Sequence, residues 1–200
     1  PYEDDERNVQ SVVFLRCEMT AGTMAVAEVA ELVHKCFPNP TVLLVEAGGC
    51  ACVSVALTRK SQAEQGATVV DSIESTGAFD PCRSGYAPFL DALGFAKLPQ
   101  GDLLAYLQGI AWAVRLSHSI TSLGFYPMCA DRNREQLGKL IARSDALAKQ
   151  VSDNRQRRRN RGLSLNESAR LRMDAKKLEA EFDSVMDSIK SVCTLGDTIE

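Results

Sequence analysis

The chain has 200 residues, of which 45% are hydrophobic and 24% are charged, and its formal net charge is -3. This composition supports a buried core and excludes a chain that is disordered throughout. No apolar run approaches the roughly 20 residues that cross a bilayer. The acidic residues 1–6 also lack the basic start of a signal peptide. We therefore expect a cytoplasmic protein with no membrane partner.

The seven cysteines are scattered and odd in number, which is typical of free thiols in a reducing compartment. Cys50 and Cys52 form one close pair, but a zinc site needs two further ligands. His34 and His118 are far apart in the sequence and do not supply a second close pair. We therefore expect neither a metal site nor a cofactor.

Residues 1–128 are predicted to form an α+β domain with a small mixed sheet. Residues 11–18, 41–46, 51–58 and 67–75 are rich in β-branched and apolar side chains, which predicts four strands. Gly48 and Gly49 supply the positive φ of a tight turn between the second and third strands. The order strand, helix, strand, strand, strand should return the second strand parallel to the first.

Helices are predicted to cover this sheet. Apolar residues recur at helical spacing from Val26 to Phe37, where Pro38 ends the pattern, and His34 is expected on the polar side. A short helix is predicted over residues 87–93. Asp102 can cap a longer helix that runs to about Gly124.

Residues 129–200 are predicted to form an antiparallel coiled-coil hairpin, because two segments repeat apolar residues every three or four positions. Ser164 and Glu167 have the spacing of a capping box, which marks the start of the second helix. The polar link over residues 154–163 is so short that the helices must run in opposite directions. The two seams consist of Leu137, Leu140, Ser144, Leu147 and Val151, and of Leu171, Ala175, Leu178, Phe182, Val185, Ile189 and Val192.

Positive charge is concentrated in this second part. Residues 132–177 carry fourteen Lys and Arg against five Asp and Glu, which gives +9 and leaves -12 for the remainder. Arginine matches the oxygens of phosphate with paired N–H donors, so the hairpin tip is a candidate site for nucleic-acid backbone or a protein partner. A solvated tip that keeps the hairpin soluble is the open alternative. The candidate binding residues are Arg155, Arg157, Arg158, Arg159 and Arg161.

No catalytic residue is expected. Glu18, Glu46, Asp71 and Glu74 lie on or near predicted strands and invite comparison with metal-dependent nucleases. No Asp or Glu on a strand is followed two residues later by Lys, which that chemistry commonly requires. No serine lies in a Gly-x-Ser-x-Gly turn, so a nucleophile with its base is not indicated either.

The run of residues 9–14, the strand pair over residues 41–46 and 53–56, and the basic hairpin together resemble an uncharacterised bacterial family, catalogued as a domain of unknown function. In that family the genes lie beside restriction-modification methyltransferases and helicases, which implies a role in defence against phage. The family usually has a lysine-rich turn, whereas this chain has arginines. The resemblance implies no catalytic residue.

The sequence thus favours a non-catalytic accessory subunit of a DNA-processing or anti-phage complex. The expected partners are a helicase or methyltransferase and the backbone of a nucleic acid. Two alternatives stay open: a degenerate metal-dependent nuclease, and a purely structural module that self-associates.

Overall fold

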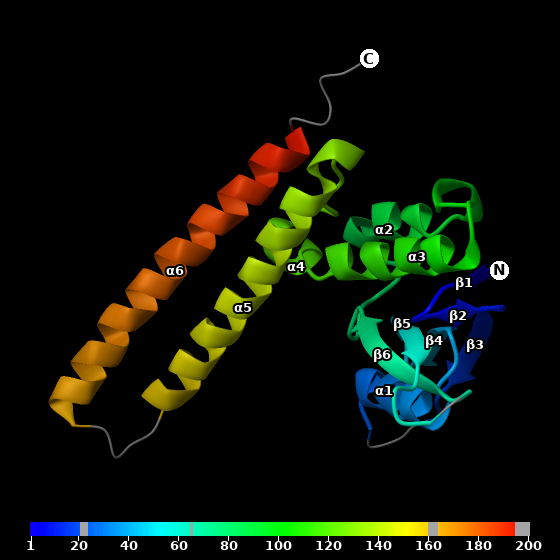
Figure 1. Ribbon diagram of the computed structural model, residues 1–200. Helices are drawn as coiled ribbons and strands as arrows, with labels where there is room; N and C mark the ends of the chain where they lie inside the picture. The colour runs from blue at the N-terminus through cyan, green and yellow to red at the C-terminus, as the bar shows by residue number, and fades with distance from the viewer. Residues whose placement is uncertain (21–23, 65, 160–163, 195–200) are drawn as a thin grey trace. The chain divides into compact units, whose positions relative to one another are not determined.

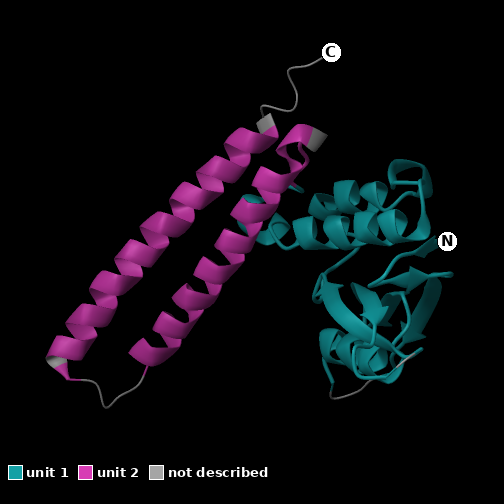
Figure 2. Cartoon of the chain, in the orientation of Figure 1, with its two compact units in different colours: residues 1–126 teal, residues 127–200 magenta. Residues whose placement is uncertain are grey.

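The computed structural model describes residues 1–20, 24–64, 66–159 and 164–194. The chain divides into two compact units, Pro1–Tyr126 and Pro127–Glu200 (Figure 2). The predicted α+β class with a mixed sheet is confirmed, and the second unit is helical. No helix in the described ranges is long and apolar enough to span a membrane.

The first unit is built on a four-stranded sheet in the order β3-β4-β5-β6 (Figure 1). Its strands are β3 (Val13–Glu18), β4 (Thr41–Ala47), β5 (Cys50–Lys60) and β6 (Thr68–Ser75). Helix α1 (Val26–Cys36) connects β3 to β4, which are parallel, while the other neighbours are antiparallel. Gly48 and Gly49 have φ of 56° and 86°, so the turn between β4 and β5 uses the backbone freedom that the sequence predicts there.

Two short strands precede this sheet and were not predicted. β1 (Tyr2–Glu3) and β2 (Asn8–Val9) pair antiparallel as a separate two-stranded sheet. The Asp4 carboxylate accepts the backbone N–H groups of Glu6 at 2.8 Å and Arg7 at 2.6 Å, which holds the turn between them. Strands of two residues are too short to produce the alternation by which strands are identified in a sequence.

Helix α1 packs on one face of the sheet. Val26 and Ala30 are buried against Leu43, Val45 and Cys52, and these five residues form one core cluster. The placement of His34 on the polar side of this helix was wrong, because His34 follows Ala30 by one helical turn and is buried.

The opposite face of the sheet packs against α3 (Leu103–Ser117), which contacts β5 and β6. The Asp102 carboxylate accepts the N–H of Ala105 at 2.8 Å, so the predicted cap is confirmed. The predicted continuous helix to Gly124 is instead interrupted, and α4 (Ile120–Leu123) follows separately. The remaining helices of this unit are α2 (Ala87–Ala92) and the 3₁₀ turns η1 (Ser84–Tyr86) and η2 (Phe95–Lys97).

The second unit contains η3 (Asp131–Asn133), α5 (Arg134–Arg158) and α6 (Leu165–Thr194). Helices α5 and α6 lie side by side and run in opposite directions (Figure 1). Arg143 forms an ion pair with Glu181 across them. At the start of α6, the Ser164 N–H donates to Glu167 Oε2 at 2.9 Å and the Glu167 N–H donates to Ser164 Oγ at 3.3 Å, so the predicted capping box is present.

The contact between α5 and α6 departs from the predicted 3.5-residue repeat. Ile141 and Asn154 are buried on α5, whereas the predicted Leu140 and Val151 are half-buried. An ideal helix has 3.6 residues per turn, so an apolar stripe drifts by about 20° per heptad when the helices stay straight. Buried positions on α6 are Leu171, Ala175, Met186, Ile189, Val192 and Cys193, while Leu178, Phe182 and Val185 are half-buried.

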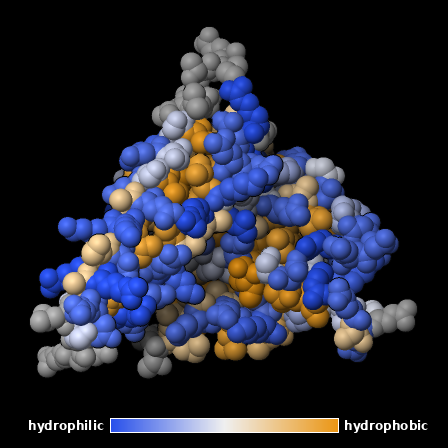
Figure 3. Space-filling view, turned by 60° about the vertical axis from the view of Figure 1, so that its left-hand side comes forward, coloured by the Kyte–Doolittle hydropathy of each residue, from blue (hydrophilic) through white to orange (hydrophobic). Residues whose placement is uncertain are grey.

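Much of the visible surface is hydrophilic, but apolar side chains also reach it (Figure 3). In the second unit the half-buried residues Leu178, Phe182 and Val185 contribute apolar atoms to the surface of α6. In the first unit Phe14 is 60% exposed and Leu32 is 50% exposed. These side chains lie outside the cores that hold each unit together.

Truncating the fully buried residues between α5 and α6 should destabilise the second unit most. We expect Leu147→Ala and Ile189→Ala each to lower the free energy of unfolding by about 2–5 kcal/mol, since both side chains are fully buried. Leu178→Ala and Phe182→Ala should have a smaller effect because these side chains are half-buried. Urea denaturation followed by circular dichroism measures the difference, and equal losses at all four sites would contradict this account of the packing.

His34 is held in its neutral form by the groups around it. The Ser54 hydroxyl donates to the Glu74 carbonyl at 3.1 Å, so His34 Nε2 must donate to Ser54 Oγ, 3.0 Å away. His34 Nδ1 is buried and has no hydrogen-bond partner among the described residues. Burial lowers the pKa of His34 below its usual 6.5, because a charged ring there would leave a buried N–H unpaired.

Stability should therefore fall as the pH drops below about 6.5. The unfolded chain then binds a proton that the folded chain excludes, so the His34 contribution is present above the unfolded pKa and lost as the pH falls toward the folded one. The slope for one proton is at most about 1.4 kcal/mol per pH unit. Urea denaturation between pH 7.5 and 5.5 tests this. We expect a shallower dependence in His34→Gln, and His118→Gln serves as the matched control that keeps the His34 contribution.

Candidate functional site

Four arginines from two helices line one hollow in the second unit. Arg155 and Arg158 come from the end of α5, Arg159 is the C-cap residue of that helix, and Arg172 comes from α6 together with Ser168. The hollow encloses about 350 Å³. We call it the arginine hollow, defined by these five residues.

Helical spacing explains why these side chains converge. Arg158 and Arg159 follow Arg155 by three and four residues, so all three lie on one side of α5. Arg172 likewise follows Ser168 by four residues on α6. The antiparallel packing of the helices brings the two sides together near the end of α5 and the start of α6.

The positive charge of the hollow is weakly compensated. No carboxylate is among its lining residues in the described part of the chain. Arg155 lies 3.8 Å from Glu179 in an exposed ion pair, whereas Arg158, Arg159 and Arg172 form no ion pair within the described residues. Residues 149–177 carry ten Lys and Arg against three Asp and Glu, for a net charge of +7. Such a concentration of like charge attracts an anion.

The residue types in the hollow suit phosphate. Each guanidinium presents paired N–H donors that match two oxygens of one phosphate group, and the Ser168 hydroxyl adds a further donor. The start of α6 contributes the positive end of its helix dipole nearby. No aromatic residue lines the hollow in the described structure, so the arrangement suits backbone phosphates and does not suit stacking on bases.

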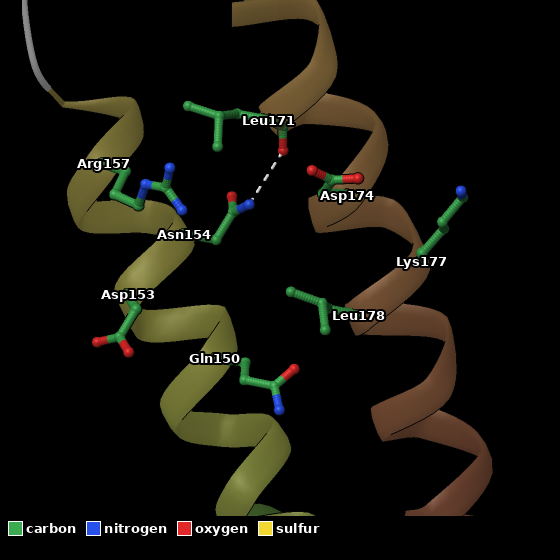
Figure 4. A pocket seen from close by; sticks show the side chains of 8 residues that line it. All are labelled: Gln150, Asp153, Asn154, Arg157, Leu171, Asp174, Lys177 and Leu178. Atoms are coloured by element: carbon green, nitrogen blue, oxygen red, sulfur yellow. Dashed lines mark hydrogen bonds between the residues drawn. The ribbon is translucent and has the colours of Figure 1, made fainter. Parts of the chain in front are cut away.

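A second groove lies between the same helices on another side of the pair, and it encloses about 440 Å³ (Figure 4). Asn154 from α5 points at α6 and donates to the Leu171 carbonyl at 3.2 Å. Its side chain is 7% exposed, and its Oδ1 atom has no hydrogen-bond partner in the described part of the chain. Lining residues are Gln150, Asp153, Asn154, Arg157, Leu171, Asp174, Lys177 and Leu178.

This second groove differs from the arginine hollow in charge. Asp153 and Asp174 accompany Arg157 and Lys177, so acidic and basic side chains balance. Arg157 therefore faces a different environment from its neighbours in the sequence. A buried asparagine between two helices is best explained as a device that fixes their alignment.

The structure groups three of the predicted binding residues and places a fourth in the second groove. Arg155, Arg158 and Arg159 line the arginine hollow, while Arg157 lines the second groove. Arg161 lies outside the described residues. The sequence prediction missed Ser168 and Arg172. The sequence places Arg172 next to Leu171, which was predicted to lie in the seam of the second helix. It does not show how the two helices are aligned, and that alignment brings Arg172 beside Arg155.

The four carboxylates considered for a nuclease are engaged by arginines. Glu18 and Glu46 are neighbours across β3 and β4, and Arg16 contacts them at 2.8 Å and 2.5 Å. Asp71 pairs with Arg7 and Arg59, and Glu74 pairs with Arg115. Among the described residues no group of three or more potential ligands could hold a metal ion. Each of the four carboxylates therefore has at least one arginine partner.

Comparison with known proteins identifies one family. No curated protein and no solved structure matches the chain. Residues 1–182 match the family model described as "Domain of unknown function (DUF4391)", so the match spans the first unit and most of the second. The chain therefore belongs to the DUF4391 family.

Proposed function

We propose that this protein is a non-catalytic accessory subunit of a bacterial DNA-processing assembly of the restriction-modification type, which acts against phage. In this proposal the arginine hollow binds the phosphate backbone of a nucleic acid. A helicase or methyltransferase is the protein partner, and the two long helices act as an antiparallel coiled coil that carries the hollow. The convergence of Arg155, Arg158, Arg159 and Arg172 is the observation that supports the proposal most strongly.

Folding these four guanidiniums together without a bound anion is unfavourable. Like charges repel, and the exposed pair between Arg155 and Glu179 at 3.8 Å offsets little of that repulsion. A bound phosphate would relieve the repulsion and make charge-assisted hydrogen bonds with several donors.

The ligand is expected to be a phosphate backbone without a preferred sequence. Backbone contacts position a protein on a duplex and carry no direct sequence information. The +7 charge of residues 149–177 is large enough to give a strong dependence on salt. The -10 charge of the remaining residues opposes binding by the isolated subunit, so a partner that covers acidic surface would increase the affinity.

The setting of the proposal comes from the resemblance noted in the sequence, which implies genes beside methyltransferases and helicases. The ion pairs of Glu18, Glu46, Asp71 and Glu74 favour an accessory role over a nuclease.

The test is the binding of duplex DNA by the full chain and by a variant in which Arg155, Arg158, Arg159 and Arg172 are all replaced by Gln. Each lost phosphate contact removes roughly 0.9 from the slope of log K against log salt, so the slope should fall by about 3 to 4 units. Affinity should fall for every duplex sequence alike. Fluorescence anisotropy at several salt concentrations measures both quantities.

The matched control replaces Lys35, Lys97, Lys139 and Lys190 by Gln. This variant has the same change in net charge, and each of these lysines forms an ion pair outside the hollow. The control should bind DNA with nearly the wild-type slope. Equal losses in both variants would reduce the effect to net charge and contradict the proposal. Cleavage of plasmid DNA with Mg²⁺ or Mn²⁺ that disappears in Glu46→Ala would contradict the non-catalytic assignment.

A further inference from the structure

The outer edge of β3 is open in the part of the chain that the structure describes. β3 stands first in the sheet order, and no described strand pairs with its other side (Figure 1). The N–H groups of Val13 and Met19 donate to the carbonyls of Pro40 and Glu46, so odd-numbered residues turn their backbone groups toward β4. Residues 14, 16 and 18 therefore direct their N–H and C=O groups away from the sheet.

Apolar side chains border this edge on both faces of the sheet. Phe14 is 60% exposed on one face. On the other face Leu15 and Cys17 are half-buried against the core cluster under α1. On α1, Leu32 is 50% exposed and follows Val29, which packs against the same core cluster, by three residues. An open strand edge bordered by apolar side chains is a template for pairing with another strand.

We propose that a second copy of this chain pairs with β3, antiparallel about a two-fold axis, and joins two four-stranded sheets into one. The same strand then serves as donor and acceptor in both copies. Residues that point their backbone groups outward must face each other, which places the axis at a residue and not between two residues. Only an axis at Leu15, Arg16 or Cys17 pairs two different members of the outward-facing set 14, 16 and 18 within β3. This surface is separate from the arginine hollow, and the pairing does not depend on the proposed function.

The charges on β3 select one of these three positions. An axis at Arg16 places two arginines directly opposite each other, which is unfavourable. An axis at Leu15 leaves Arg16 opposite Phe14 and leaves Glu18 without an opposite charge. An axis at Cys17 places Arg16 opposite Glu18 of the second copy, and symmetry makes the same contact twice. Arg16 and Glu18 are 64% and 69% exposed and already form an ion pair at 2.8 Å within their own chain. The contact with the second copy would therefore join two such pairs into one network of opposite charges.

The selected register also places Cys17 opposite its own copy. Facing residues that do not exchange backbone hydrogen bonds have Cα atoms about 4.5 Å apart in an antiparallel pair. That separation lies within the range of roughly 4.4–6.8 Å that a disulfide bond spans. Cys17 is a free thiol in the described structure. A disulfide bond between the two Cys17 residues would therefore identify this register.

The competing explanation is that Arg16 and Glu18 keep the edge from pairing at all, because charged residues protect edge strands in many proteins. That explanation predicts a monomer. It also predicts that reversing either charge leaves the protein a monomer, and that mixing the two variants has no effect.

Sedimentation velocity of the full chain distinguishes the dimer from the monomer. Concentrations up to about 100 µM are sufficient to detect a dimer with a dissociation constant in the micromolar range. We expect a dimer for the wild type. Arg16→Glu and Glu18→Arg should each weaken the dimer about tenfold or more, because each places like charges opposite each other twice. An equimolar mixture of the two variants should restore a dimer, since each position 16 then faces a position 18 of opposite charge. Circular dichroism checks that both variants fold.

Mild oxidation with diamide should then link two wild-type chains through Cys17, and Cys17→Ser should remove that link while the other cysteines stay in place. A wild-type monomer at the highest concentration would overturn the proposal. So would a dimer that both single variants retain, because another surface such as the α5–α6 pair would then hold it. A dimer without the Cys17 link would exclude the proposed register.

Discussion

The packing of α5 against α6 is the constraint on which the candidate site depends. Leu147 and Ile189 are fully buried, and Asn154 donates to the Leu171 carbonyl within this contact. A buried asparagine disfavours any shift of one helix along the other, because a shift would leave its N–H donors unpaired. This alignment brings Arg172 to the three arginines at the end of α5. The apolar contact therefore determines where the positive charges meet.

The arginine hollow has the properties expected of a site that is completed by its ligand. Charge repulsion among the guanidiniums opposes the folded arrangement, and the buried residues of the helix pair must offset it. A bound anion would attract all four guanidiniums, so the arginine cluster would then favour the folded arrangement. The first unit has a different character, since the carboxylates of Glu18 and Glu46 are paired with Arg16 and His34 is buried in neutral form.

The sequence predicts the regular elements well where a local signal exists. Gly48 with Gly49, Asp102, and Ser164 with Glu167 each predict a turn or a cap that the structure contains. Features without a local signal were missed. The strands β1 and β2 have two residues each and give no such signal. His34 is a different case, because its spacing of one helical turn from Ala30 indicated the buried side, while its polar partner Ser54 comes from a distant strand.

The candidate site was likewise only partly predictable from the sequence. The arginine-rich segment is visible in the sequence, but its partition between two sides of α5 depends on the helix, and the contribution of Arg172 depends on the alignment of α5 with α6. The repeat of apolar residues is compatible with neighbouring alignments, and the drift from Leu140 to Ile141 alters which residues are buried. The residues that meet across α5 and α6 therefore cannot be assigned from the spacing of apolar residues alone.

The most direct measurement is a titration of isotope-labelled protein with a short DNA duplex, followed through the arginine side-chain Nε–Hε signals in nuclear magnetic resonance spectra. The account predicts that the signals of Arg155, Arg158, Arg159 and Arg172 shift together at one DNA concentration, while those of Arg16 and Arg115 in the first unit stay in place. Shifts confined to the first unit, or shifts of Arg157 without the other four, would contradict the assignment of the arginine hollow as the phosphate-binding site.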